Sequence, residues 1–236
     1  MTEDAISIGG VDLADPSVYA EGIPYDAFRR LRERAPVAWH PHKDGPGFRA
    51  LTGYDEVFAV SRDSATWSSE ATGVSFDLPG LGDDSRGVLM LTMDPPRHTA
   101  LRGLVSKGFT PRQVAKLNEH ITDMARDVVD SVIERGECDF ANDVAGALPS
   151  YAIAEMLGIP LEDGYRLYEL TEIMNRGQID TRAIDAAAEM FAYATELAAR
   201  KRAHPGDDIA TSLLQAEVEG QRLTDMEFNF FFMLLI

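Results

Sequence analysis

The sequence predicts a mainly α-helical protein with a small β portion near its N-terminus. Apolar residues recur at intervals of three and four across 114–132, which is the spacing of one helix face. Thr224 and Glu227 form a capping box, which marks the start of another helix. Two short β-type runs, 37–40 and 48–52, are separated by turn residues and predict a hairpin.

The N-terminal elements follow in a simple order. Residues 1–22 predict an irregular arm with short local order, and residues 25–34 predict an amphipathic helix. The segment 43–47 contains glycine and proline and supplies the turn of the hairpin. Residues 54–61 predict a second, shorter helix.

Residues 68–92 read differently from the stretches around them. They combine glycine and proline with scattered apolar residues, and the stretch is too long for a simple connection. One interpretation is a surface loop. We favour a lid over a ligand, because the apolar residues need something to cover them.

The second half of the sequence predicts a series of helices. The first is opened by Thr110 and Pro111 and ended by Gly136. The others are expected over 148–157, 162–175, 183–202, 209–217 and from 225 onward. In the helix 183–202 the side chains expected to face inward are Ile184, Ala187, Ala188, Phe191 and Leu197.

Composition limits the class of protein. The chain has 236 residues, 45% of them hydrophobic, and a net charge of −17, which argues against general nucleic-acid binding. The start carries no secretory pattern and no apolar run reaches membrane-spanning length, so we expect a cytoplasmic protein. The single cysteine, Cys138, excludes an internal disulfide and is interpreted as a partly buried free thiol.

A basic stretch interrupts this acidic sequence. Between Pro95 and Asn118 there is no Asp or Glu, although the run holds five cations. Asp94 is expected to cap a helix that starts at Pro95. On that helix His98 and Arg102 lie four residues apart and share one face, where each donates to a carboxylate or phosphate. The stretch therefore predicts a site for an anion.

The same stretch carries a family resemblance. The string Met-Asp-Pro-Pro-Arg-His-Thr-Ala-Leu-Arg from Met93 to Arg102, followed by Lys-Gly-Phe-Thr-Pro-Arg, resembles the C-helix signature of bacterial cytochrome P450 enzymes, the haem-thiolate monooxygenases. The run from Glu227 to Ile236 resembles the start of their central I helix. The resemblance implies a cytochrome P450 fold, interrupted within the I helix, with residues 1–236 as a single domain incomplete at its C-terminus.

The resemblance also implies roles for particular residues. His98 and Arg102 would bind the two propionates of haem b. The residues implied to contact the haem are Leu91, Phe109, Met233 and Leu234. Those implied to line the substrate pocket are Val74, Phe76, Met90 and Met174. Those implied to dock a redox partner are Arg97, Lys107, Arg112 and Lys116. For the apolar residues, ordinary core packing is the alternative.

The expected function follows from the resemblance. It implies a monooxygenase that uses O2 and electrons from a ferredoxin and its reductase, and that hydroxylates a lipid, sterol or terpenoid-like substrate, as actinobacterial lipid and sterol hydroxylases do. The catalytic residues and the metal ligand are expected outside this chain, because Cys138 lacks the surroundings of the family's ligand loop. The alternative is a non-catalytic helical module that binds an anionic ligand or an acidic protein. A phosphate-handling enzyme is disfavoured, since no P-loop is present.

Overall fold

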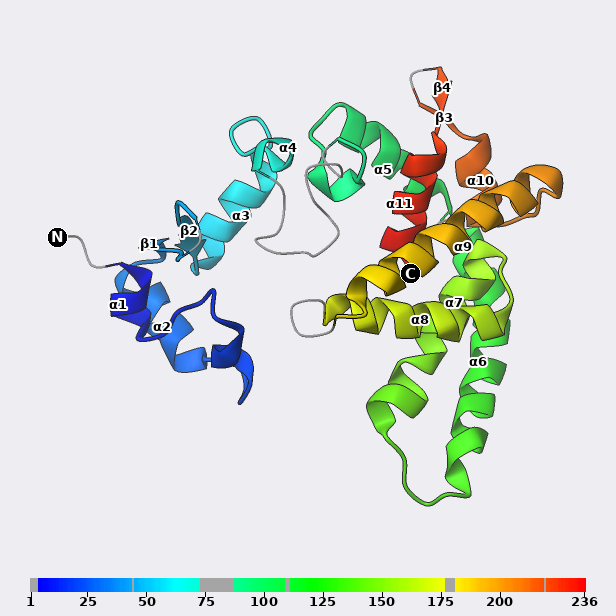
Figure 1. The fold of residues 1–236 in the computed structure, drawn as a ribbon, viewed down its shortest axis with the longest axis horizontal. Coiled ribbons are helices and arrows are strands. Elements are labelled where there is room, and N and C mark those ends of the chain that lie inside the picture. Colours follow the sequence, from blue (N-terminus) through cyan, green and yellow to red (C-terminus); the bar gives the residue numbers. More distant parts are fainter. Residues whose placement is uncertain (1–3, 44, 73–86, 109–110, 177–180, 219) are drawn as a thin grey trace. The chain divides into compact units, whose positions relative to one another are not determined.

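The computed structural model describes residues 4–43, 45–72, 87–108, 111–176, 181–218 and 220–236. At residues 105, 107, 108, 111–114, 116, 119, 218 and 221 it describes the backbone alone. The chain divides into two compact units, Met1–Trp67 and Ser68–Ile236, and each is described by itself (Figure 1). The expected single domain stays a prediction.

The N-terminal unit consists of short helices and one β-hairpin, as predicted. Its elements are α1 (Ala5–Gly9), the 3₁₀ turn η1 (Pro16–Tyr19), α2 (Tyr25–Arg34), β1 (Val37–His40), β2 (Phe48–Leu51) and α3 (Tyr54–Arg62). The strands pair antiparallel, with Val37 opposite Leu51 and His40 opposite Phe48. Leu31 of α2 is fully buried and packs with α1 and the hairpin.

His40 is a fully buried polar residue of this unit. Its Nε2 accepts a hydrogen bond from the Leu13 N–H at 2.9 Å, and its Nδ1 lies 2.7 Å from the carbonyl oxygen of Pro41. Its ring stacks on Phe48 with 4.6 Å between centroids. A neutral imidazole satisfies both contacts, because one ring nitrogen accepts and the other donates. The ring therefore joins the N-terminal arm to the hairpin.

The C-terminal unit is built from helices on one core. Its elements are α4 (Ser69–Thr72), η3 (Met90–Thr92), α5 (Arg97–Gly108), α6 (Pro111–Ile133), the π-helical turn η4 (Phe140–Ala145), α7 (Ala147–Leu157), α8 (Leu161–Asn175), α9 (Ala183–Ala203), α10 (Ile209–Gln215), β3 (Glu217–Val218), β4 (Gln221–Arg222) and α11 (Asp225–Leu235). Figure 1 shows α9 running past α8 and α11, with which it packs. The structure confirms the mainly helical class with a small β portion.

One apolar cluster holds these helices together. Leu101 of α5, Leu157 of α7, Leu167 of α8, Leu197 of α9 and Phe228 of α11 all belong to it and are at most 1% exposed. Burial of apolar side chains from five helices is the dominant favourable contribution to a helical fold of this kind. The cluster therefore sets how α5 and α11, which carry the predicted site residues, lie against the rest of the unit.

The buried face of α9 differs from the predicted one. Of the five side chains predicted to face inward, Leu197 is buried, whereas Ile184 is 69% exposed. The buried residues are Ala183, Ala186, Met190, Ala194, Leu197 and Ala198. They also recur at intervals of three and four, so the sequence offered two alanine-rich faces with similar spacing. The smaller side chains face α8 and α11 and allow close helix packing.

The helix predicted over 209–217 ends earlier than expected. α10 stops at Gln215, and β3 pairs with β4 as a short antiparallel hairpin. Gly220 lies in the turn with φ +79°, a conformation that glycine adopts without steric cost. The chain therefore reverses before α11. The capping box at the start of α11 is confirmed, since Thr224 and Glu227 bond reciprocally.

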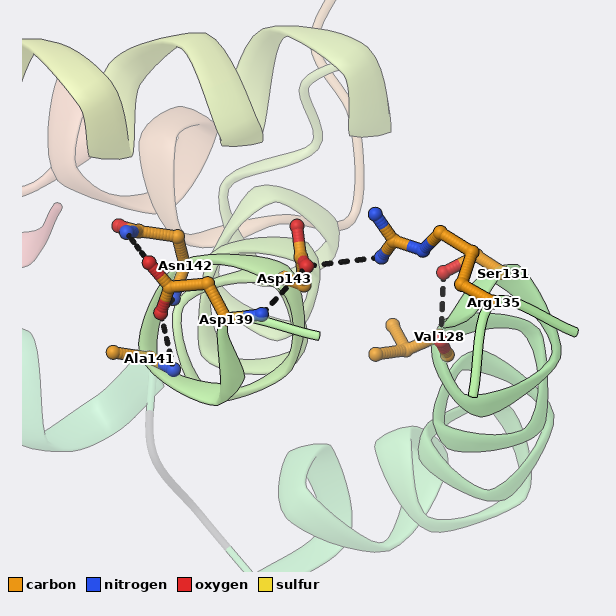
Figure 2. A network of polar contacts seen from close by, with 7 residues as sticks. All are labelled: Val128, Ser131, Arg135, Asp139, Ala141, Asn142 and Asp143. Carbon is orange, nitrogen blue, oxygen red and sulfur yellow. Dashed lines mark hydrogen bonds and ion pairs between the residues drawn. The ribbon is translucent and has the colours of Figure 1, made fainter. Parts of the chain in front are cut away.

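A polar turn joins α6 to α7 (Figure 2). Gly136 follows the last turn of α6 with φ +72°, as the sequence predicted for the helix end. The carboxylate of Asp139 accepts the N–H of Ala141 at 3.1 Å and so caps η4. The guanidinium of Arg135 donates to Asp143 at 2.9 Å. Figure 2 shows that these side chains come from both sides of the turn, with Arg135 on the α6 side and Asp139 and Asp143 on the η4 side. Their hydrogen bonds stabilise the reversal of the chain.

A buried ion pair lies where α7, α9 and α10 meet. The Nζ of Lys201 lies 2.5 Å from Oδ2 of Asp208 and donates to the carbonyl of Gly158 at 2.8 Å. Asp208 also caps α10 by accepting the Thr211 N–H at 2.7 Å. Gly158 has φ +65°, and a Cβ there would lie 2.5 Å from both Lys201 Nζ and Asp208 Oδ2. Only glycine suits this position.

Within the described ranges, no individual helix combines the length and the apolar composition that a membrane crossing requires. Two successive segments, Phe140–Leu157 and Leu161–Asn175, meet those criteria only when they are taken together, and they are bent by 119°.

Candidate functional site

The site is centred on the first turns of α5. This helix begins at Arg97, later than predicted. The carboxylate of Asp94 accepts the Ser69 N–H at 2.9 Å and the Ser68 hydroxyl, so it supports the start of α4. Its main-chain carbonyl accepts the His98 N–H at 3.0 Å. The prediction that the Asp94 side chain caps α5 is therefore wrong, because the unpaired N–H groups of α4 compete for the same carboxylate.

His98 and Arg102 lie four residues apart on α5, as predicted. The His98 ring is half-buried and the Arg102 side chain is exposed. Within the part of the chain that the structure describes, neither side chain forms a hydrogen bond or an ion pair with another side chain. Hydrogen bonds from Ser68 and Ser69, and then the nearby His98, hold the pKa of Asp94 below its ordinary value. Among the described residues, the donors of this pair are therefore not used by another side chain.

Arg97, the first residue of α5, has a different environment. Its guanidinium pairs with the carboxylate of Glu227 in the first turn of α11. The Glu227 side chain is 7% exposed, and its second oxygen accepts the N–H and the hydroxyl of Thr224 at 2.8 and 2.9 Å. Burial raises the pKa of Glu227, but the Thr224 hydrogen bonds and Arg97 outweigh it, so the pKa lies below its ordinary value. The sequence analysis identified Glu227 only as a capping residue.

The apolar residues of the predicted site fall into two groups. Met90, Met174 and Met233 are half-buried and pack against the apolar cluster that holds the helices together. Leu91 is 46% exposed, and Leu234 is half-buried. The structure therefore brings three methionines from η3, α8 and α11 to one cluster. Val74, Phe76 and Phe109 lie outside the described residues.

The remaining basic residues are described only in part. The backbone of Lys107 lies in α5, and that of Arg112 and Lys116 lies in α6. Their side chains lie outside the described part of the structure. For these three residues a docking role stays a prediction.

Cys138 is exposed rather than partly buried. It lies between the end of α6 and η4. Among the residues that the structure describes, no group of three His, Cys, Asp or Glu side chains lies close enough to bind a metal ion.

Comparisons with known proteins point in one direction. No protein-family model matches the chain. The chain is 37% identical over 241 residues to the steroid C26-monooxygenase of Rhodococcus jostii, a match that covers 96% of this chain and 51% of that protein. It is 34% identical over 249 residues to the methyl-branched lipid omega-hydroxylase of Mycobacterium bovis, covering 98% of this chain and 58% of that protein.

Comparison of the fold with solved structures agrees with the sequence comparison. A solved structure of a cytochrome P450 from Mycobacterium marinum, in complex with pseudoionone, matches with a TM-score of 0.77 and 34% identity. That match covers 89% of this chain and 55% of the solved chain. The chain spans about half the length of the curated relatives that it matches.

Proposed function

We infer that this chain, which corresponds in sequence and fold to the N-terminal portion of the bacterial cytochromes P450, supplies the propionate clamp and one pocket wall of a haem-dependent monooxygenase. The observation that carries this proposal is the pair His98 and Arg102. They share one side of α5, and among the described residues neither forms a hydrogen bond or an ion pair with another side chain. The proposal concerns the whole protein, in which the cysteine-containing ligand loop of the family would also be required.

The donor set fits a haem with two propionates. Arg102 presents a guanidinium fork that pairs with a carboxylate through two parallel bonds, and His98 adds a second donor one turn away. These donors compensate the carboxylates for the water they lose on binding. When bound, haem b supplies the iron at which O2 is reduced and one oxygen atom is inserted into a C–H bond. Met233 and Leu234 of α11 would cover one side of the cofactor.

The proposed substrate is a hydrophobic small molecule. Met90 and Met174 are half-buried and apolar, and flexible methionine side chains adapt to irregular apolar ligands. Two relatives are named for a steroid and for a methyl-branched lipid, which supports a sterol or a lipid chain as substrate. Val74 and Phe76, which lie outside the described residues, stay predicted pocket residues.

A spectral titration tests the function and the substrate class together. We expect a sterol or a methyl-branched fatty acid to shift the Soret band of the haem-loaded full-length protein, because a hydrophobic ligand bound in the pocket would change the surroundings of the haem. Glucose serves as the polar control and should leave the spectrum unchanged. If no sterol and no branched lipid changes the spectrum, the proposed substrate class is wrong.

The electron donor is proposed to be an acidic ferredoxin, supplied by its reductase. Lys107, Arg112 and Lys116 belong to a stretch without acidic residues, in a chain whose net charge is −17. A cluster of basic residues in an acidic protein steers an acidic partner to one place, and these three residues are close in sequence.

Charge reversal at Arg112 tests this docking proposal. We expect Arg112→Glu to slow reduction by the ferredoxin about tenfold at low salt and to weaken the salt dependence of that rate, because rim charges act mainly on association. Arg126→Glu is the matched control near the other end of α6, where Arg126 is 68% exposed. Equal rates and equal salt dependence for wild type and Arg112→Glu would remove Arg112 from the docking surface.

A further inference from the structure

The ion pair between Arg97 and Glu227 joins two helices that are far apart in sequence. Arg97 is the first residue of α5, and Glu227 lies in the first turn of α11, 130 residues later. The Arg97 side chain is 47% exposed, but the Glu227 side chain is 7% exposed. Each oxygen of this carboxylate has its own donor, since Arg97 bonds one and Thr224 bonds the other. The contact is therefore a built junction rather than a surface pair.

The junction bears on the direction of the two predicted propionate ligands. Arg97 and Leu101 lie four residues apart and share one face of α5, where Leu101 is fully buried in the apolar cluster. His98 and Arg102 each come one residue later, which places them about 100° further around the helix. The rotation of α5 about its axis therefore decides where His98 and Arg102 point.

Leu101 and Arg97 both limit that rotation, and Leu104 packs against the same apolar cluster. Leu101 makes an apolar contact, which is not directional. Arg97 makes a charge-assisted contact, whose geometry is specific. α11 also carries Met233 and Leu234, so Glu227 connects the helix of the proposed propionate clamp to the helix of the proposed cofactor wall.

We propose that Arg97 and Glu227 are positioning residues, which fix α5 against α11 so that His98 and Arg102 meet the propionates together. The inference rests on the proposed function of this site. It assigns Arg97 to the interior organisation of the site instead of to redox-partner docking. Neither residue contacts the substrate or the reacting atoms in this proposal.

Haem loss from the full-length, haem-loaded protein to excess apomyoglobin measures the proposed effect. We expect Arg97→Gln and Glu227→Gln each to speed haem loss about tenfold, the lower end of what partners that orient a ligand contribute. Glutamine keeps the capping box with Thr224, so Glu227→Gln removes the charge without removing the cap. The double variant should equal the single variants, because both remove the same contact. Arg97→Lys keeps the charge, so this variant should lose haem at close to the wild-type rate.

A stability control separates positioning from general loosening. Val128→Ala shortens a buried side chain of α6 and should lower the melting temperature while leaving the rate of haem loss at wild-type level. All rates are taken at 15 °C below the lowest melting temperature in the set, so that every variant stays folded.

Three outcomes contradict the inference, and they are distinguishable. Unchanged haem loss in both glutamine variants overturns the positioning role while leaving the proposed function in place. If Arg97→Gln then also changes the salt dependence of reduction by the ferredoxin, Arg97 returns to the docking residues. If Val128→Ala speeds haem loss as much as the glutamine variants do, the pair of Arg97 and Glu227 is only an ordinary stabilising contact. A wild-type protein that takes up no haem overturns both the inference and the proposed function.

Discussion

Replacing both His98 and Arg102 with alanine is expected to leave the full-length protein largely without haem. A hydrogen bond to a charged group contributes about 1.5–3 kcal/mol, and each such loss corresponds to a factor of about 10 to 100 in affinity. Neither side chain forms a hydrogen bond or an ion pair with another described side chain, so their removal should leave the fold intact. Haem affinity is measured by titrating the haem-free protein and following the Soret band.

Conservative variants sharpen this prediction. Arg102→Lys keeps the charge but loses the fork that bonds two carboxylate oxygens at once, so its affinity should fall between those of wild type and Arg102→Ala. Arg126→Ala is the matched control, since Arg126 is an exposed arginine of α6 that pairs only with Asp123 in the described structure. If His98→Ala and Arg102→Ala bind haem as tightly as Arg126→Ala does, the assignment of the clamp is wrong.

The largest effect on stability is expected from Lys201→Met. The Lys201 and Asp208 side chains are 12% and 8% exposed, so methionine would leave the carboxylate buried without its cation. Breaking one partner of a buried ion pair costs about 3–5 kcal/mol of the free energy of unfolding. Asp208 also caps α10, so the start of that helix should loosen as well. Denaturant unfolding, followed by circular dichroism, measures the loss.

Two further variants control this experiment. Lys201→Met combined with Asp208→Asn should recover much of the stability, because asparagine removes the charge and still caps a helix. Arg166→Met breaks an exposed pair with Glu189, whose side chains are 52% and 51% exposed, and should cost less than about 1 kcal/mol. A Lys201→Met protein as stable as Arg166→Met would contradict the importance of the buried pair.

Local signals in the sequence predicted most helix ends correctly. Pro111 opens α6, Gly136 follows its end, and the reciprocal bonds of Thr224 and Glu227 open α11. These signals work because the unpaired N–H and C=O groups at a helix end are satisfied by residues only a few positions away. The spacing of His98 and Arg102 belongs to the same class, since four residues along a helix always bring two side chains to one side.

Features that depend on tertiary contacts were not predictable in this way. The inward face of α9 was predicted only in part, since Leu197 is buried but Ile184 is exposed. Alanine-rich positions give no preference between two faces, and the packing of α8 and α11 decides. The partner of Glu227 lies 130 residues away, and no periodicity connects it to Arg97. His40 likewise is a polar residue, and nothing in the sequence around it predicts burial. It is fully buried, in contact with an N-terminal arm that the sequence predicts to be irregular.

The absorption spectrum of the purified full-length protein, reduced and exposed to carbon monoxide, tests the central claim most directly. We expect a strongly red-shifted Soret band, which indicates haem held by a cysteine thiolate, in a protein whose propionate clamp is His98 and Arg102. A protein without haem, or with a Soret band that carbon monoxide does not shift in this way, would contradict the account. The helical module that binds an anion without catalysis would then be the better description of this chain.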